Sequence, residues 1–159
     1  MTAPAQSSAL TDVLQAKHVS YELIPHQRTQ SAAAEAQAIG VDPGHVAKTL
    51  VLETGEGFVR AVLSASERID LRKAKAILGS GDVHLASEQV LAGAYPEFEL
   101  GAVPPVGGPR GDLVLVDERL RDAESVVFEA GTHDHSVRMK TADLISVADA
   151  RIADICQDQ

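Results

Sequence analysis

Hydrophobic and polar positions divide this chain into short elements of two kinds. Runs rich in Val, Ile and Leu, several of them alternating with polar residues, predict strands. Ala-rich or amphipathic stretches bounded by capping residues predict helices. The predicted strands cover residues 19–24, 46–52, 58–63, 83–86, 113–117, 126–130 and 136–139. The predicted helices cover residues 10–16, 31–39, 70–78 and 87–91, followed by a mostly helical segment at 141–155.

Glycine, proline and aspartate mark where several of these elements start or stop. Gly40 and Gly79 follow two predicted helices, at positions where a glycine can adopt the left-handed conformation that ends a helix. Asp42 followed by Pro43 predicts one short capped turn. The turn predicted at residues 54–57, between two strand-like runs, indicates a β-hairpin.

The order of the elements points to the α+β class. Strands come in neighbouring pairs separated by single helices, without the regular βαβα alternation of a doubly wound fold. We therefore predict a mixed, mainly antiparallel sheet flanked by helices. The length of 159 residues predicts a single domain, residues 1–159, with residues 1–8 as a frayed lead-in. The Gly- and Pro-dense stretch at 103–111 is predicted to be a loop within this domain.

Composition narrows the function classes. The net charge of −9, from 14 basic and 23 acidic residues, argues against a protein that grips nucleic acid over its whole surface, but leaves room for a local basic patch. Aromatic residues make up 3% of the chain, which argues against a platform that stacks several bases. Cys156 is the single cysteine, so no internal disulfide can form and a reducing cytoplasm is the predicted compartment. No apolar run approaches the roughly 20 residues that span a bilayer.

Lys48 is the first candidate for chemistry. On a strand its side chain shares one face with Leu50 and Leu52, while Thr49 and Val51 share the other. If the leucine face is the core face, the ammonium group starts at the rim of the core, where desolvation lowers its pKa. Such a lysine could polarise a carbonyl or hold a polar substrate. The alternative interpretation is a strand-end lysine that reaches water.

The segment G-A-V-P-P-V-G at residues 101–107 is the second candidate. Its two prolines fix φ and remove two backbone donors, so a rigid loop could bind a small polar ligand through its backbone groups. A plain turn between strands is the alternative. The overlapping G-G-P-R-G at 107–111 lacks the spacing and the Lys-Ser/Thr pair of a phosphate-binding loop, which excludes that function.

Two further groups of polar residues stand out. His133 and His135 are two positions apart and, with His26, could bind zinc. The interpretation we favour is a polar turn around Gly131 that contributes a wall or a hydrogen bond to a pocket. A basic helical face is predicted from Arg68, Arg72 and Lys75, with Lys73 nearby; it could meet a phosphate backbone or be a solvated surface. Cys156 is placed in a terminal helix without a positive neighbour to activate it.

Several short motifs, in this order and spacing, resemble the YbaK / prolyl-tRNA editing-domain family of aminoacyl-tRNA deacylases. The resemblance runs from about Tyr21 to Leu144. The motifs are Y-E-L-I-P-H-Q-R-T at 21–29, A-K-T-L-V at 47–51, I-D-L-R-K at 69–73, G-A-V-P-P at 101–105 and E-A-G at 129–131.

The resemblance implies a barrel-like sheet flanked by helices, with one cleft, and hydrolysis of the ester that joins a wrong amino acid to tRNA. The essential lysine of the family corresponds to Lys48, and its G-x-x-x-P loop, which shapes the aminoacyl site, corresponds to residues 101–105. No metal or other cofactor is implied. With the basic face added, the expected residues are catalytic Lys48 and Gly101, substrate-binding His26, Thr29, Ser64, Val103, Pro104, Pro105, Gly131 and His133, and tRNA-binding Arg68, Arg72, Lys73 and Lys75.

Within the family, the segments G-A-V-P-P-V-G and F-E-A-G-T-H-D-H-S-V resemble the YeaK-like branch, associated with seryl- and threonyl-tRNA, more than the YbaK type, associated with cysteinyl-tRNA. Other branches are associated with alanyl-tRNA. Ser64 stands where family members often have proline, which leaves the amino-acid specificity open. The implied partners are mischarged tRNA and an aminoacyl-tRNA synthetase, with the protein a monomer or weak homodimer. The alternative function is a non-catalytic tRNA- or synthetase-associated binding module of the same fold, against which the retained Lys48 argues.

Overall fold

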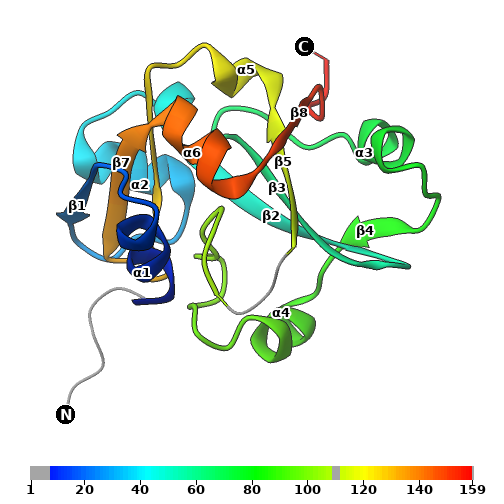
Figure 1. Ribbon diagram of the computed structural model, residues 1–159, viewed down its shortest axis with the longest axis horizontal. Coiled ribbons are helices and arrows are strands. Elements are labelled where there is room, and N and C mark those ends of the chain that lie inside the picture. Colours follow the sequence, from blue (N-terminus) through cyan, green and yellow to red (C-terminus); the bar gives the residue numbers. More distant parts are fainter. Residues whose placement is uncertain (1–7, 109–111, 159) are drawn as a thin grey trace.

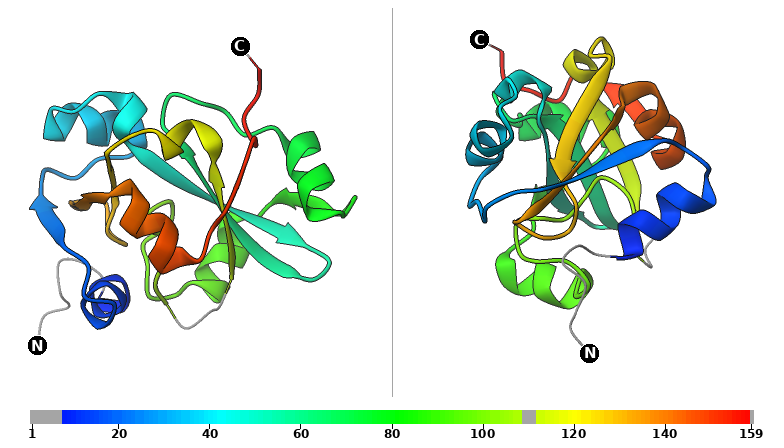
Figure 2. Two further views of the ribbon diagram at one scale, coloured as in Figure 1. Left: turned by 45° about the horizontal axis from the view of Figure 1, so that its top comes forward. Right: turned by 90° about the vertical axis from the view of Figure 1, so that its left-hand side faces the viewer.

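The computed structural model describes residues 8–108 and 112–158 (Figures 1 and 2). The helices are α1 (Ser8–Ala16), α2 (Ala32–Ile39), the 3-10 turn η1 (Pro43–His45), α3 (Leu71–Leu78), α4 (Glu88–Ala94), α5 (Glu118–Arg121) and α6 (Thr141–Ala148). The strands are β1 (Tyr21–Pro25), β2 (Ala47–Thr54), β3 (Gly57–Ser64), β4 (Val83–Leu85), β5 (Leu113–Asp117), β6 (Ser125–Glu129), β7 (His135–Lys140) and β8 (Arg151–Ala153). The predicted lead-in lies outside the described residues except for Ser8, and so do residues 109–111 of the predicted loop.

The strands form two sheets, one of three strands in the order β1-β7-β6 and one of five in the order β4-β2-β3-β5-β8. All pairings are antiparallel except β3 with β5 and β5 with β8, which confirms the α+β class and the mixed, mainly antiparallel pairing. The expectation of a barrel-like sheet is corrected, because the two sheets do not close. They meet at an isolated parallel bridge between Val46 and Val127.

The main core lies between the two sheets and takes side chains from both. Its fully buried members include Val62 of β3, Val116 of β5, Val126 of β6 and Val137 of β7, with Leu10 of α1 closing one end. Figure 2 shows α2 and α6 on opposite sides of the three-stranded sheet. Among the described residues, no helix has the length and apolar character needed to cross a membrane.

Local capping explains why the predicted helices lie where they do. The hydroxyl of Ser31 accepts from the backbone N–H of Ala34 at the start of α2, and Gly40 ends that helix with φ of 82°. The carboxylate of Asp70 caps α3, and Gly79 ends it with φ of 66°. These capped helices and the β2–β3 hairpin agree with the predictions from the sequence.

The predicted helical segment at 141–155 is correct only in its first half. The helix ends at Asp149, a non-glycine residue with φ of 49°, and Arg151–Ala153 then form β8, which pairs in parallel with β5. Cys156 consequently lies outside a helix, bridged to Ile69 and fully buried, which raises the pKa of its thiol to about 12. Tertiary pairing with a strand far along the chain overrides the local helical pattern here.

Candidate active site

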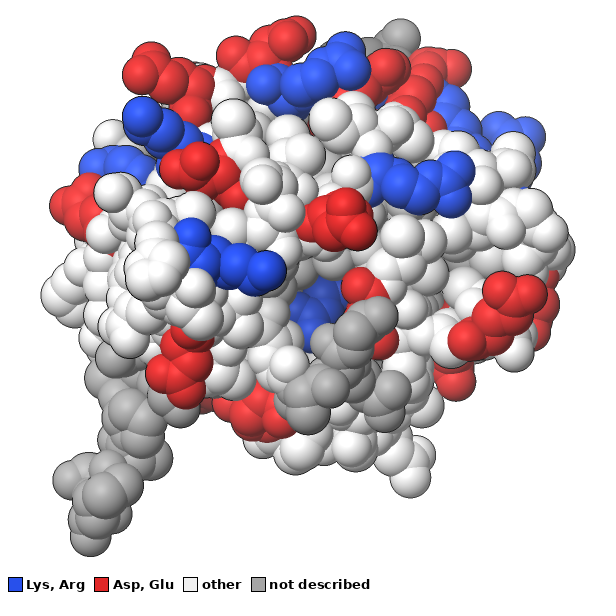
Figure 3. Space-filling view, viewed as in Figure 1, with Lys and Arg blue, Asp and Glu red and all other residues white. Residues whose placement is uncertain are grey.

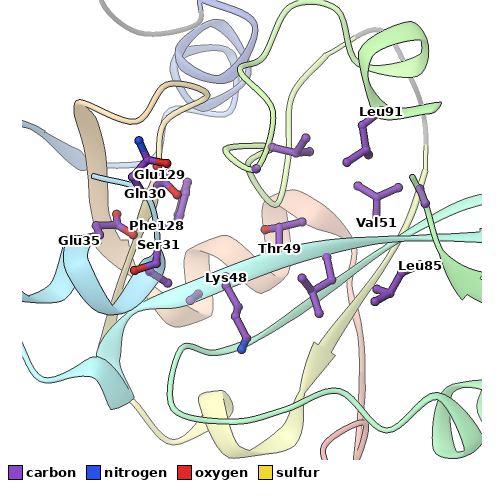
Figure 4. A pocket seen from close by; sticks show the side chains of 16 residues that line it. Gln30, Ser31, Glu35, Lys48, Thr49, Val51, Leu85, Leu91, Phe128 and Glu129 are labelled. Carbon is purple, nitrogen blue, oxygen red and sulfur yellow. The ribbon is translucent and has the colours of Figure 1, made fainter. Parts of the chain in front are cut away.

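A cavity of about 310 Å³ lies along an edge of β2, between the two sheets (Figure 4). One end of this edge is the bridge at Val46, and at the other end the backbone N–H of Ala86 donates to the carbonyl of Val51. Between these two points, β2 borders the cavity. The volume falls within the range of small-molecule sites in proteins. The fold therefore leaves a gap in the pairing of β2 that is large enough for a small ligand.

Thr49 stands at the middle of this edge. Alternate residues of a strand direct their backbone N–H and C=O groups to opposite edges, so Thr49 directs its groups to the same side as Val51, which is the cavity side. The Oγ1 atom of Thr49 is buried and has no hydrogen-bond partner among the described residues. Figure 4 shows this side chain on the cavity side of the strand. The site thus holds a polar atom and backbone groups that a ligand could satisfy.

Lys48 also contributes to the cavity wall, but its side chain leaves β2 on the side opposite to Thr49 (Figure 4). Its Nζ atom donates a hydrogen bond of 2.7 Å to the backbone carbonyl of Glu67. Burial lowers the pKa of Lys48 below its ordinary value. The ammonium group is therefore half-buried and held by a neutral carbonyl.

The loop that begins at Gly101 forms another part of the wall, through Gly101 and Val103. Gly101 has φ of 82°, and a Cβ atom on it would lie 3.5 Å from Cε1 of His133. Pro104 and Pro105 do not line the cavity, in contrast to the prediction that they bind substrate. The carbonyl of Pro104 points instead to a buried cation.

That cation is Arg60, whose side chain is 2% exposed. Its two terminal nitrogens donate to the carbonyls of Pro104, at 2.9 Å, and Gly107, at 2.6 Å. Its guanidinium group lies 5.0 Å from the centroid of the Tyr95 ring, and its Nε is 3.6 Å from the carboxylate of Asp112. Arg60 therefore holds the loop at Pro104 and Gly107, next to the residues Gly101 and Val103 that line the cavity.

An acidic wall closes the cavity on the side of α2 and β6. Glu35 of α2 is fully buried, accepts a hydrogen bond from the hydroxyl of Ser136, and has an Oε1 atom without a partner among the described residues. Burial raises its pKa to about 8. Glu129 of β6 is bonded to Nδ1 of His133 at 2.7 Å, and burial raises its pKa to about 7.

The other predicted substrate-binding residues lie mostly behind this wall. Nε2 of His26 is 2.9 Å from the hydroxyl of Ser136, and the backbone N–H of Thr29 donates to the carbonyl of His133. The carbonyl of Gly131 accepts from the backbone of Glu99. These residues support the acidic wall and do not line the cavity themselves.

Ser64 lies away from the cavity. Its hydroxyl is 3.4 Å from the carbonyl of Pro43 and 2.8 Å from the hydroxyl of Ser66. Ser64, which was predicted to bind substrate, is therefore not among the residues that line the cavity.

The predicted basic face is divided in the structure. Arg68 and Arg72 are exposed, the Arg72 side chain to 93%. Lys73, in contrast, lies 2.9 Å from Asp154 and 2.8 Å from Asp158, so its charge is neutralised locally. On the face in Figure 3, the described acidic and basic side chains are intermixed, without a broad basic area.

The zinc alternative finds no arrangement to support it. Nδ1 of His133 is bonded to Glu129 and its Nε2 to the carbonyl of Leu100, while His135 contacts Asp134. Within residues 8–108 and 112–158, no group of three or more His, Cys, Asp or Glu side chains is placed to hold a metal ion. Gly131, with φ of 91°, lies in a turn as predicted, but neither it nor His133 is among the residues that line the cavity.

The cavity residues that were not singled out from the sequence include Glu35, Glu129 and Thr49. A signal for Glu35 was present, because its spacing places it on the same helix face as Ala32 and Ile39, where a charged residue is unexpected. Glu129 and Thr49 stand within quoted motifs, but nothing in the alternation of their strands separates them from structural residues.

The family model described as "Aminoacyl-tRNA editing domain" matches residues 26–147, well over half of the chain. The "Multifunctional Ser/Thr-tRNA deacylase ProXp-y" of Escherichia coli (strain K12) is 29% identical over 147 residues, which cover 87% of this chain and 86% of that protein. The "Putative Cys-tRNA(Pro)/Cys-tRNA(Cys) deacylase EbsC" of Enterococcus faecalis is 23% identical over 136 residues, covering 85% and 82%.

A solved structure, "Crystal structure of a putative trans-editing enzyme for prolyl tRNA synthetase", superimposes with a TM-score of 0.86 and 25% sequence identity. The superposition covers 99% of this chain and 100% of that one. The overall fold is thus shared with this similar protein.

Proposed function

We propose that this chain, which belongs to the aminoacyl-tRNA editing-domain family, hydrolyses the ester bond of mischarged tRNA at the edge of β2. The observation that carries this proposal is the cavity itself. Within the matched segment, it brings together Lys48, the backbone and hydroxyl of Thr49, and Gly101. The place of action that follows is the cytoplasm, where tRNA is charged.

Ester hydrolysis needs little covalent help from a protein. The oxygen of a water bonds to the acyl carbon, the bond from that carbon to the ribose oxygen breaks, and one proton of the water goes to the ribose oxygen. An aminoacyl ester is already reactive, so positioning and donors for the developing oxyanion can supply most of the acceleration. The backbone N–H of Thr49 is one such donor on the cavity side of β2.

Lys48 is the second donor in this proposal. An ammonium group has three N–H donors, and the Glu67 carbonyl takes one of them. Because that partner is neutral and the group is half-buried, turning toward a polar substrate breaks no ion pair. The lowered pKa makes Lys48 an easier proton donor than an exposed lysine.

For the amino acid, we propose seryl- and threonyl-tRNA as the preferred substrates. The E. coli relative carries this specificity in its name, whereas the E. faecalis relative is named for cysteinyl-tRNA. The cavity pairs polar atoms at Thr49 and Glu35 with apolar walls at Val51 and Leu91, which suits a small side chain with a hydroxyl group. Alanine and cysteine are small enough for the same pocket but lack the hydroxyl group, so alanyl- and cysteinyl-tRNA are expected as slower substrates.

For the body of the tRNA, we propose a local electrostatic contact through Arg68, Arg72 and Lys75. Phosphate contacts of this kind are weak and sensitive to salt, which suits a protein that samples many tRNAs. Docking on an aminoacyl-tRNA synthetase would raise the local concentration of substrate without changing the cavity.

The test is deacylation of a panel of tRNAs charged with serine, threonine, cysteine, alanine and their own cognate amino acids. We expect hydrolysis above the buffer rate, fastest for serine or threonine. The variant Gly101→Ala places a methyl group 3.5 Å from His133 in a backbone conformation that favours glycine, so it should change the ratio of rates among these amino acids. Retention of tRNA binding without hydrolysis of any ester would instead favour the non-catalytic binding module.

A further inference from the structure

The acidic wall of the cavity contains a carboxyl group that the reaction outlined above does not use. Glu35 is fully buried and lines the cavity, yet its Oε1 atom has no hydrogen-bond partner among the described residues. A buried polar atom without a partner is costly for a folded protein, by about 1–3 kcal/mol. Because this carboxyl group is at the wall of a cavity, its unpaired oxygen points to a ligand that supplies the missing hydrogen bond.

Glu129 stands next to Glu35 on the same wall. The residue paired with Glu129 across β6 and β7 is Ser136, whose hydroxyl donates to Glu35, so the two carboxyl groups share one small region. Figure 4 shows both side chains at the same end of the cavity, with Gln30 and Ser31. No Lys or Arg of the described residues forms an ion pair with either carboxylate.

We propose that Glu35 and Glu129 form a subsite that holds the α-ammonium group of the aminoacyl ester. This inference rests on the proposed function and assigns the part of the substrate that the acidic wall recognises. An ammonium group brings one positive charge and three N–H donors to two acidic groups that otherwise repel one another. The ester carbon then lies toward Thr49, and the amino-acid side chain lies toward the apolar wall of Val51 and Leu91.

An organic ammonium fits this wall better than a metal ion. A hard divalent cation needs about six oxygen ligands, and the described residues offer two carboxylates without a third group placed to join them. The Oε2 atoms of both residues are already used, one by His133 and one by Ser136. What remains suits two or three hydrogen bonds from one compact cation.

The charges around the wall agree with a cation that arrives with the substrate. The charged and polar neighbours of Glu35 are Glu129, Ser136 and, through that serine, His26. Glu129 interacts electrostatically with His133, Glu99 and Arg28 as well. Arg28 is committed to an ion pair with Glu99. Burial raises the pKa of both carboxyls, so an entering ammonium group would favour their ionised forms and release a proton.

The experiment compares two esters that differ only at this group. One tRNA carries serine, and the same tRNA carries the matching 2-hydroxy acid, in which a neutral hydroxyl replaces the ammonium group. Each enzymatic kcat/KM is divided by the uncatalysed hydrolysis rate of the same ester, because the two esters differ in intrinsic reactivity. We expect the protein to prefer the amino ester by about 10- to 100-fold after this correction, the range for hydrogen bonds to charged groups.

The variants Glu35→Gln and Glu129→Gln keep the size of each side chain and remove its charge. Each should reduce the preference for the amino ester by about tenfold or more, with a smaller effect on the 2-hydroxy ester. The control Glu56→Gln changes an exposed glutamate in the β2–β3 turn and should keep the full preference. If a variant fails to fold, the two esters with the unaltered protein still decide the question.

The outcomes separate the two proposals. Equal corrected rates for both esters with the unaltered protein, or an unchanged preference in Glu35→Gln, would overturn the ammonium subsite and leave the deacylase function standing. Hydrolysis of neither ester would overturn the proposed function itself.

Discussion

The pKa values of two carboxyl groups, Asp154 and Glu35, are shifted in opposite directions, and their surroundings explain why. Asp154 lies 2.9 Å from both Arg119 and Lys73, and its hydrogen bond with Arg119 is the main reason that its pKa falls to about 2. Glu35 is enclosed by α2 and β7 without a cation beside it, and burial raises its pKa to about 8. Asp154 is thus an ionised carboxylate paired with two cations, whereas Glu35 is held in its neutral form and has no ion pair with a Lys or Arg of the described residues.

Comparing the surroundings of Asp154 and Glu35 indicates which of the two belongs to a binding site. The cluster around Asp154 joins α3, α5 and the segment after β8. Its acidic and basic side chains pair with one another, so the cluster stabilises the fold. The wall around Glu35 is incomplete and borders a cavity. Strongly shifted pKa values occur in both kinds of place, so the missing partner, more than the shift, marks the binding site.

Lys48 provides the largest expected effect. It is the counterpart of Lys73: one lysine is held by a neutral carbonyl at the cavity, and the other by two carboxylates. Lys48→Ala should lower the deacylation rate by at least about 100-fold, the usual cost of losing one donor to an oxyanion. Circular dichroism and thermal unfolding should show that the fold survives, with exposed Lys17→Ala as the control. Deacylation by Lys48→Ala at the rate of the unaltered protein would remove this residue from the mechanism.

Arg60 is a buried cation that, unlike Glu35, has a charged partner and two carbonyl partners beside it, although its Nε atom makes no hydrogen bond among the described residues. Arg60→Ala leaves the carbonyls of Pro104 and Gly107 and the carboxylate of Asp112 without their cation. We expect a loss of about 3–5 kcal/mol in the free energy of unfolding, measured by urea denaturation. The control Arg138→Ala removes an ion pair to Glu22 at a half-exposed site and should cost about 1 kcal/mol or less. A similar loss of unfolding free energy in Arg60→Ala and Arg138→Ala would show that burial does not make Arg60 more important for stability than an exposed arginine.

Glu35 should make the protein less stable as the pH rises. The unfolded chain releases this proton near pH 4.5, whereas the folded protein holds it to about pH 8. Between these two pH values, Glu35 lowers the free energy of unfolding by up to about 1.4 kcal/mol for each unit that the pH rises. Glu35→Gln does not titrate, so its free energy of unfolding relative to the unaltered protein should rise across this window. A difference that stays constant with pH would contradict the raised pKa.

Asp154→Asn should show the reverse dependence. The folded-state pKa of Asp154 is depressed, so its contribution is present above about pH 4 and is lost as the pH falls toward 2. The deficit of Asp154→Asn, followed by acid denaturation, should therefore be largest near neutral pH and vanish in acid. If the deficit grew in acid, the ion pairs of this cluster would not be the source of the shift.

The smallest effect is expected for the basic face. Neutralising Arg72 and Lys75 together should flatten the salt dependence of tRNA binding by about two units of slope or less. Hydrolysis of a minimal aminoacyl-nucleotide ester should stay nearly unchanged, because that substrate has no stem to contact. A salt titration that gives the same slope for both proteins would mark this face as an ordinary solvated surface.

The same contrast explains how much the sequence could predict. Helices with local caps, such as α2 after Ser31 and α3 after Asp70, depend on residues a few positions apart, and these were predicted. The acidic wall depends on Ser136 meeting Glu35 from 101 positions away, and no local pattern encodes that contact. Lys73 was assigned to the basic face because its partner Asp154, 81 positions away, is not evident from the helix alone.

The most direct test of the account is the pKa of Glu35, measured by 13C NMR of labelled glutamate side chains in the free protein and with a bound substrate analogue. The analogue is a seryl group joined to adenosine through an amide, which the protein cannot hydrolyse as an ester. We expect a pKa of about 8 in the free protein, a clear fall when the analogue with a free α-amine binds, and no fall with the 2-hydroxy acid analogue. An ordinary pKa near 4.5 in the free protein, or the same response to both analogues, would contradict this expectation.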